Sequence, residues 1–334
     1  MTAKKTKKWP YRLINGLFLL GYQSKITRFF MKRSPSFKQG DAKNHLMLSE
    51  GFTFCTVLVL VFSLIFSIVT KALSNHFDFK ATAAYVFISY LLMSASVFFG
   101  GFIAVRRGGY SIREVAPLKT DKMTFIIVGL VLLGTYFGLS GVNQWFLSFL
   151  EGFGYVADVP AMAPKTPLNV ILSVVFICIV PALSEEFLFR GVLIRATKSL
   201  GQIWCAVISA AAFSLYHMSP NQTVYQFIVG ILYAVIAIKL DSLVPTVILH
   251  FLNNLLVVCW YYFYPQFSLT GPLQIAATLL GLVALGAALI LLFKRGTKGE
   301  ERLAHTKTDR IEFFMAIGPG FLCCLVIWIA NLVA

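Results

Sequence analysis

The stretch Ser184-Glu185-Glu186-Phe187-Leu188-Phe189-Arg190 places two adjacent carboxylates inside an apolar run. Between Lys165 and Lys198 the only charged residues are these two glutamates, Arg190 and Arg195. An ionised carboxylate is costly in such surroundings, so we expect it to be paired and to serve a function. The rest of the sequence is therefore examined for partners of this glutamate pair.

The composition is that of a membrane protein. Of the 334 residues, 58% are hydrophobic and 13% are charged, and the mean hydropathy is +0.77. A soluble domain has roughly 45–50% apolar and about 25% charged residues. We therefore predict an all-α polytopic membrane protein. The six cysteines lie in apolar stretches without a CxxC pair, which is typical of small hydrophobic core residues.

Nine stretches are long enough to span a bilayer, which takes roughly 20 residues. They lie near 51–73, 83–105, 124–150, 167–199, 202–218, 222–239, 243–263, 272–293 and 311–333. Connections rich in Lys and Arg alternate with nearly neutral ones. By the positive-inside rule, the N-terminus is predicted to be cytoplasmic and the C-terminus outside, in a plasma membrane. Residues 1–50 are basic, and the apolar part at 13–22 is too short to span, which leaves an interfacial helix and a disordered arm both open.

The net charge of +15 is concentrated in these short segments. In a membrane protein such clusters indicate topology and contact with anionic lipid. No nucleic-acid-binding module is recognisable, so nucleic acid is not expected as a partner.

Two further polar motifs lie in predicted spans, Phe213-Ser214-Leu215-Tyr216-His217 and His250-Phe251-Leu252-Asn253-Asn254. His250 and Asn254 are four residues apart and share a helix face, as do Glu186 and Arg190, which can form an ion pair.

The depths of these residues can be compared along the predicted helices. Glu185 and His217 are equally far along the chain from the turn at Gly201, so an unbroken hairpin would put them at one depth. Glu185 is roughly 24 Å from that turn, and His250 is roughly 13 Å from the turn at Asp241. Glu185 and His250 can meet only if the hairpin of the fourth and fifth spans projects into the cytosol or if the helices tilt.

Several chemistries remain open for these residues. A carboxylate in an apolar site can take a proton from water. Two histidines and a glutamate could instead bind a divalent metal such as zinc, whose bound water would be the nucleophile. An asparagine amide and a histidine can stabilise an oxyanion. A structural alternative is that the histidines form helix-to-helix hydrogen bonds and the Glu–Arg pair is a clamp.

The patterns Glu185-Glu186-x-x-x-Arg190, Phe213-x-x-x-His217 and His250-x-x-x-Asn254 resemble the three motifs of the CPBP intramembrane proteases. That family includes the CAAX prenyl endopeptidase and bacterial Abi members linked to bacteriocin self-immunity and peptide maturation. The resemblance covers roughly residues 124–263. It implies a helix-bundle core of the CAAX protease type and hydrolysis of a peptide bond in a membrane-associated peptide or protein.

The resemblance also implies roles for the motif residues. It implies that Glu185 is the general base, with His217 as its partner on the water or on a metal, and that His250 and Asn254 stabilise the oxyanion. The supporting residues are Glu186, Arg190 and Phe213. If a metal is present, its ligands would be Glu185, His217 and His250. The family is described both as metalloproteases and as metal-independent glutamate proteases, and this sequence fits either.

On this interpretation the chain divides into four parts. They are a basic cytoplasmic or interfacial segment at 1–50, accessory spans at 51–123, a catalytic core at 124–263 and C-terminal spans at 264–334.

Three alternatives compete with the protease. Gly138-Leu139-Ser140-Gly141 resembles the GxSG of rhomboid serine proteases, although close packing by small residues is the simpler interpretation. A non-catalytic scaffold or immunity protein that binds a protein partner is the second. A transporter is the third, but no inverted repeat supports it.

Overall fold

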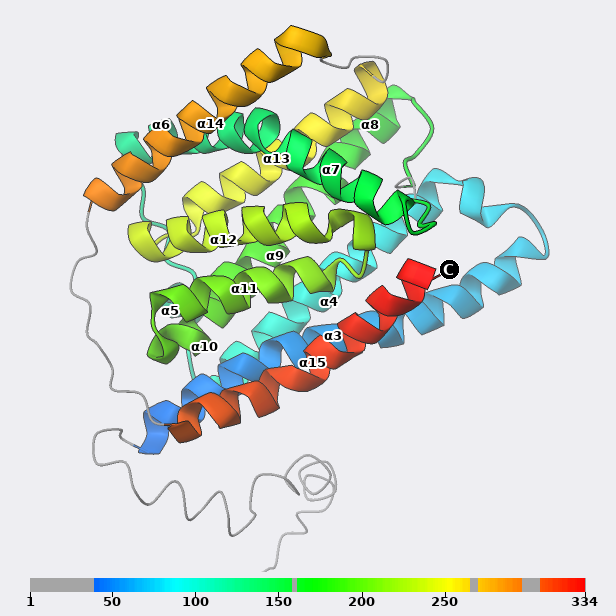
Figure 1. Cartoon of the computed structure of the whole chain (residues 1–334). Helices are drawn as coiled ribbons and strands as arrows, with labels where there is room; N and C mark the ends of the chain where they lie inside the picture. The colour runs from blue at the N-terminus through cyan, green and yellow to red at the C-terminus, as the bar shows by residue number, and fades with distance from the viewer. Residues whose placement is uncertain (1–38, 158–160, 265–269, 296–306, 334) are drawn as a thin grey trace, which may run out of the picture.

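The computed structural model describes residues 39–157, 161–264, 270–295 and 307–333. In these residues every regular element is a helix, and the helices pack side by side in one bundle (Figure 1). The prediction of an all-α polytopic membrane protein is confirmed. The apolar part at 13–22, for which an interfacial helix and a disordered arm were both left open, lies outside the described residues.

The main helices follow one another in this order: α3 Gln39–Ser74, α4 Ala83–Gly108, α5 Ile112–Val115, α6 Lys122–Leu133, α7 Ser140–Glu151, α8 Pro167–Ser173, α9 Val180–Glu186, α10 Ile194–Thr197, α11 Gln202–Tyr216, α12 Thr223–Leu240, α13 Val244–Phe263, α14 Gly271–Lys294 and α15 Lys307–Val333. Three 3₁₀ turns connect them, η1 Phe79–Ala81, η5 Lys198–Leu200 and η6 Pro220–Gln222. Three π-helical segments interrupt them, η2 Gly134–Gly138, η3 Val174–Ile179 and η4 Phe187–Leu193.

Eight helical stretches within the described residues are long and apolar enough to cross a membrane. The fifth predicted span, 202–218, is shorter than expected: α11 has 15 residues and ends at Tyr216, so His217 lies at its C-cap. Figure 1 nevertheless shows α11 running beside α12, against which it packs closely. The first predicted span, 51–73, lies within α3, of which the part Leu46–Ser74 is long and apolar enough to cross a membrane.

Capping residues fix several helix ends. Thr82 accepts a hydrogen bond from the backbone of Tyr85 at the start of α4, and Gly109 ends that helix with φ at +73°. Asp121 caps α6 through the Thr124 amide. Such caps satisfy backbone groups that have no partner within the helix, which places the turns of the bundle.

The fourth span is one long helix containing two of the π segments. The segments η3 and η4 flank α9, whose last two residues are the glutamate pair. A π segment shifts the hydrogen-bond pattern from i→i−4 to i→i−5 and is frequent at functional sites. In both segments a carbonyl accepts a hydrogen bond from another helix: Asn254 donates to Ile177 and Ser209 donates to Phe189.

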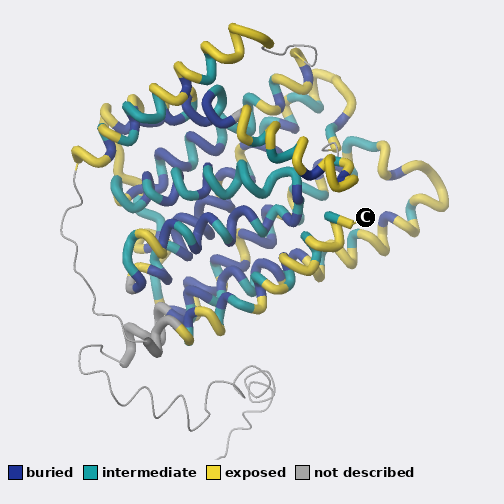
Figure 2. Tube along the Cα trace, in the orientation of Figure 1, coloured by how far each residue is buried: buried dark blue, intermediate teal, exposed yellow. Residues whose placement is uncertain are grey.

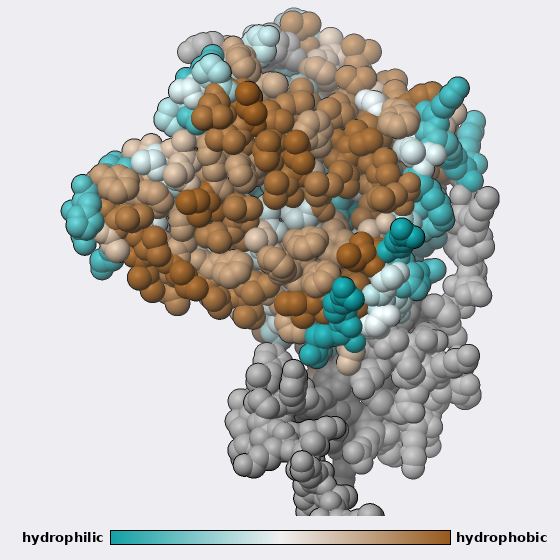
Figure 3. Space-filling model, turned by 180° about the vertical axis from the view of Figure 1, so that it is seen from behind, coloured by the Kyte–Doolittle hydropathy of each residue, from teal (hydrophilic) through white to brown (hydrophobic). Residues whose placement is uncertain are grey.

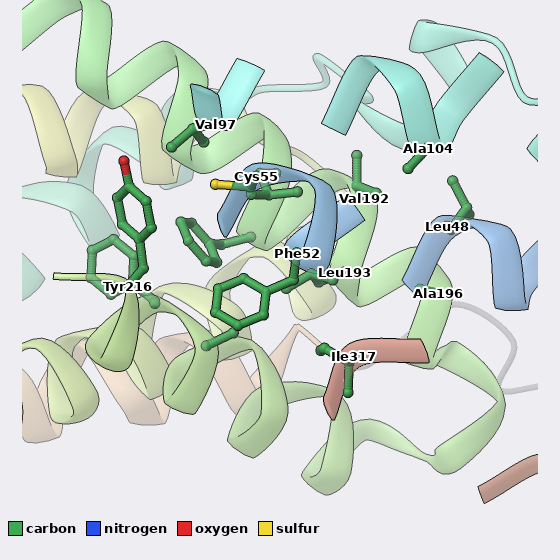
Figure 4. Close-up of a cluster of buried hydrophobic side chains, with 14 of the residues drawn as sticks. Leu48, Phe52, Cys55, Val97, Ala104, Val192, Leu193, Ala196, Tyr216 and Ile317 are labelled. Atoms are coloured by element: carbon green, nitrogen blue, oxygen red, sulfur yellow. The ribbon is translucent and has the colours of Figure 1, made fainter. Parts of the chain in front are cut away.

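Two apolar cores lie on either side of the glutamate pair. One joins α3, α4, η4, α11 and α15 and includes Phe52, Cys55 and Tyr216 (Figure 4). The other joins α6, α12, α13 and α14 and includes Tyr233 and Leu249. In Figure 2 the buried residues run through the centre of the bundle, where these cores meet.

Gly138 and Gly281 bring η2 and α14 into backbone contact. A Cβ at Gly281 would lie 2.5 Å from the Gly138 nitrogen, so no larger residue fits. Gly138 of the GxSG-like sequence therefore has a packing role, as small residues have in membrane helix pairs. The Ser140 side chain is outside the described residues.

The outer surface of the bundle is apolar. Exposed side chains on the outer helices include Leu64, Ile68, Leu280 and Val283. Figure 3 shows a broad apolar face with hydrophilic residues gathered toward its edges. This distribution suits a multi-pass protein surrounded by lipid.

Candidate active site

Glu186 and Arg190 form the predicted ion pair. Arg190 Nη1 donates to Glu186 Oε1 at 2.8 Å, and both side chains are fully buried. The guanidinium carbon of Arg190 lies 4.2 Å from the Phe213 ring centroid and 5.4 Å from that of Tyr233. The cation is therefore held by one carboxylate and by ring faces from both cores.

His250 connects the two glutamates. Its Nδ1 lies 2.9 Å from Glu186 Oε1, and its Nε2 lies 3.8 Å from Glu185 Oε2. An ionised carboxylate only accepts hydrogen bonds, so Nδ1 carries the hydrogen that bonds Glu186. This bond sets the ring orientation and turns Nε2 toward Glu185.

Glu185 is held much less tightly than its neighbour. Its side chain is buried, yet within the described residues Oε2 has no hydrogen-bond partner. Buried polar atoms are almost always hydrogen-bonded, so an exception marks a place where a ligand or reacting molecule can bind.

The predicted hairpin register is present around Glu185. Phe189 and Phe213, which are equally far along the chain from Gly201, have ring centroids 5.3 Å apart. His217 interacts electrostatically with Glu185, and its Nδ1 donates to the Phe213 carbonyl at 2.8 Å. That bond leaves Nε2 of His217 as the nitrogen available to other groups.

Asn254 is fixed by the π segment that precedes α9. Its Nδ2 donates to the Ile177 carbonyl at 2.9 Å, which uses one of its two amide hydrogens. The neighbouring Asn253 accepts a hydrogen bond from Tyr225 instead. His250 and Asn254 thus both reach the fourth span from the same face of α13.

Glu186 has one partner that was not predicted. Its pairing with Arg190 is confirmed, and its Oε1 also accepts a hydrogen bond from His250. The sequence could not show this contact, since it joins helices 64 residues apart. It also gave no sign that Tyr233 of α12 would lie against Arg190, because a tyrosine in an apolar helix carries no spacing signal.

The side chains were tested for a metal centre. Within the described residues no three His, Cys, Asp or Glu side chains are grouped closely enough to hold an ion. Glu185, His217 and His250 do not form such a group among the described residues. Metal binding by these three residues stays a prediction.

Comparison with known families agrees with the motifs. Residues 167–256 match the family model described as type II CAAX prenyl endopeptidase Rce1-like. The family resemblance is thereby confirmed for this segment. The Rce1-like segment contains all three motifs and lies within the predicted core at 124–263. No curated protein and no solved structure matches the chain. The match shows that this segment is similar to CAAX-type prenyl endopeptidases.

Proposed function

We propose that this protein hydrolyses a peptide bond of a membrane-associated peptide or protein, with Glu185 as the base that activates water. The observation that carries the proposal is the difference between the contacts of the two glutamates. Oε1 of Glu186 is bound by both Arg190 and His250, although its Oε2 is without a partner, whereas Glu185 is not in the ion pair with Arg190 and its buried Oε2 has no hydrogen-bond partner among the described residues. A base needs a free oxygen lone pair within reach of its water.

Water can bind between Glu185 and His250. Their 3.8 Å separation is too long for a direct hydrogen bond, and a molecule lying off the line between Oε2 and Nε2 can bond both atoms. Glu185 would take a proton from this water as its oxygen forms a bond to the carbonyl carbon. The protonated Glu185 would then give that proton to the leaving nitrogen as the C–N bond breaks.

The developing oxyanion requires hydrogen-bond donors. Asn254 keeps a second amide hydrogen after bonding Ile177. His250 can donate from Nε2 when its ring is doubly protonated, and the Glu186 carboxylate on Nδ1 would stabilise that cation, as a buried carboxylate does for a catalytic histidine. His217 remains the proposed partner of Glu185 on the water. We propose that Glu186 acts through His250 and does not touch the substrate.

The test is a cleavage assay in nanodiscs with a panel of fluorogenic membrane-anchored peptides. Glu185→Gln should lower kcat by roughly 10²–10⁴-fold, which is the usual contribution of general acid–base catalysis. Glu151→Gln is the matched control, because Glu151 is exposed at the end of α7. Full activity of Glu185→Gln would overturn the proposal. If the folded Glu185→Gln and His217→Ala variants kept the protein's biological activity, a partner-binding scaffold or immunity protein would be the better explanation.

The same assay separates the metal-dependent alternative. We propose that activity survives dialysis against a chelator. Loss of activity that zinc restores would show instead that Glu185, His217 and His250 gather around an ion during the reaction.

A further inference from the structure

A groove of about 590 Å³ lies between α3 and α4, away from the glutamate pair. It is formed at the end of the bundle where α3 ends and α4 begins, and it is lined only by these helices and the short connection between them. Its volume is within the range of small-molecule sites, which is roughly 300–1,000 Å³. Nothing in the proposed peptidase chemistry uses it.

The groove changes character along its length. Its inner end is lined by Val59, Phe62, Leu92 and Met93 together with serines, and the hydroxyls of Ser89 and Ser96 are already bonded to carbonyls of their own helix. Ser63 is a further polar lining residue. The outer end holds both lysines of the lining, Lys71 and Lys80, with Ser67, Thr70 and Ser74. A ligand that fills the groove therefore meets mainly apolar side chains at one end and two cations at the other.

The outer end contains groups that lack partners. Thr70 is 5% exposed, and its hydroxyl has no hydrogen-bond partner within the described residues. Neither Lys71 nor Lys80 forms an ion pair with another described residue, although both line the same groove. Two ammonium groups without a carboxylate attract an anion.

We propose that this groove binds an anionic amphiphile that carries a phosphate group, with the phosphate at Lys71 and Lys80 and an acyl chain along the apolar end. The hydroxyls of Ser67, Thr70 and Ser74 recur at three- and four-residue spacing on one face of α3, where they can donate to phosphate or ester oxygens. Phe66 and Tyr85, whose stacked rings have centroids 5.3 Å apart, also line the groove.

The inner end of the groove adjoins the apolar core that joins α3, α4, η4, α11 and α15. The carbonyl of Met93 accepts a hydrogen bond from the Tyr216 hydroxyl at 3.2 Å. Figure 4 shows Tyr216 beside Cys55 and Val97 in the core that joins α3, α4 and α11. An acyl chain against Met93 would therefore support the contact between α4 and α11, and binding should raise the thermal stability of the whole protein. This inference does not depend on the proposed peptidase activity.

Native mass spectrometry of the detergent-purified protein tests the proposal by titration with phosphatidylglycerol and with phosphatidylcholine. We expect preferential binding of phosphatidylglycerol. The double variant Lys71→Gln/Lys80→Gln should weaken it about 30-fold, since each lysine near an anionic lipid contributes about 1 kcal/mol. Lys165→Gln/Lys294→Gln removes the same charge from exposed positions outside the groove and should bind like the wild type.

Two further measurements sharpen the result. Ser67→Trp leaves the charge unchanged but fills the groove from an exposed position, and it should reduce binding of phosphatidylglycerol. Inorganic phosphate is added as a competitor: displacement of the lipid shows that the phosphate group alone is recognised, and no displacement shows that the acyl chain is needed. Equal binding of the two lipids, or equal loss in the two double variants, would overturn the proposal.

Discussion

Replacing Glu186 with glutamine tests how the structure divides the work between the two glutamates. The substitution keeps the shape of the side chain but removes the charge that faces Arg190. Both members of this pair are fully buried, so the guanidinium would remain in the core without its counter-ion. Breaking a buried ion pair in this way costs about 3–5 kcal/mol. The amide oxygen can still accept from His250, so we expect a loss near the lower end of that range.

Glu185→Gln should behave differently. Its Oε2 has no hydrogen bond to lose within the described residues, and Nε2 of His250 is 3.8 Å away. We expect a stability change of about 1 kcal/mol or less, which is the scale of a single hydrogen bond. Activity, in contrast, should be lost.

The assay is reversible unfolding in SDS and mild-detergent mixtures, followed by tryptophan fluorescence. The double variant Glu186→Gln/Arg190→Met provides the internal control, because removal of both charges leaves no isolated ion and should recover about 2 kcal/mol of the loss. Equal stabilities for Glu185→Gln and Glu186→Gln, or no recovery in the double variant, would refute the reasoning.

Three other substitutions test the packing around the site. Gly281→Ala should destabilise the bundle by about 1–3 kcal/mol in the same unfolding assay, because its Cβ would collide with Gly138. Gly286→Ala is the control and should be neutral or slightly stabilising, because a Cβ there would have nothing within 4 Å. Equal effects of the two substitutions on stability would contradict the glycine contact. Ser209→Ala should cost about 1–2 kcal/mol, since it leaves a buried carbonyl of η4 without its donor, and unchanged stability would show that the π segment does not need this bond. Asn254→Ala should lower both stability and kcat, because Asn254 is the residue proposed to donate to the oxyanion. Asn253→Ala should lower stability alone. Equal kcat values for the two variants would argue against the proposed role of Asn254.

Local spacing predicted much of this arrangement. The four-residue separation of Glu186 and Arg190 was sufficient for the ion pair, since a helix face is a local property. The hairpin around Gly201 likewise predicted the register in which Phe189 meets Phe213. The contact between His250 and Glu186 depends on how α13 packs on α9, and no periodicity in one sequence encodes that distance. The π segments were also missed, because a single shifted hydrogen bond hardly changes an apolar sequence.

The length of the fifth span was mispredicted for a related reason. Hydropathy continues through Met218, but α11 ends at Tyr216, and Met218 adopts a positive φ of 51°. Helix termination here places His217 at the C-cap, where its Nδ1 reaches the carbonyl of Phe213. A histidine at a helix end can orient its other nitrogen more freely than one inside a helix. The short span is therefore part of what positions the proposed partner of Glu185.

Adjacent residues of a helix point about 100° apart, and this angle explains why two neighbouring glutamates can have separate tasks. Glu186 is bound by Arg190 one turn along its own helix and by His250 of α13, and Arg190 in turn lies against Tyr233 of α12. Glu185 points toward the other core and interacts electrostatically with Tyr216 and His217. The two nitrogens of His250 face the two carboxylates in turn, so the imidazole is placed to pass a change in one glutamate to the other. His250→Gln should therefore reduce activity even if water is activated by Glu185 alone, because Glu186 would no longer be coupled to the reaction.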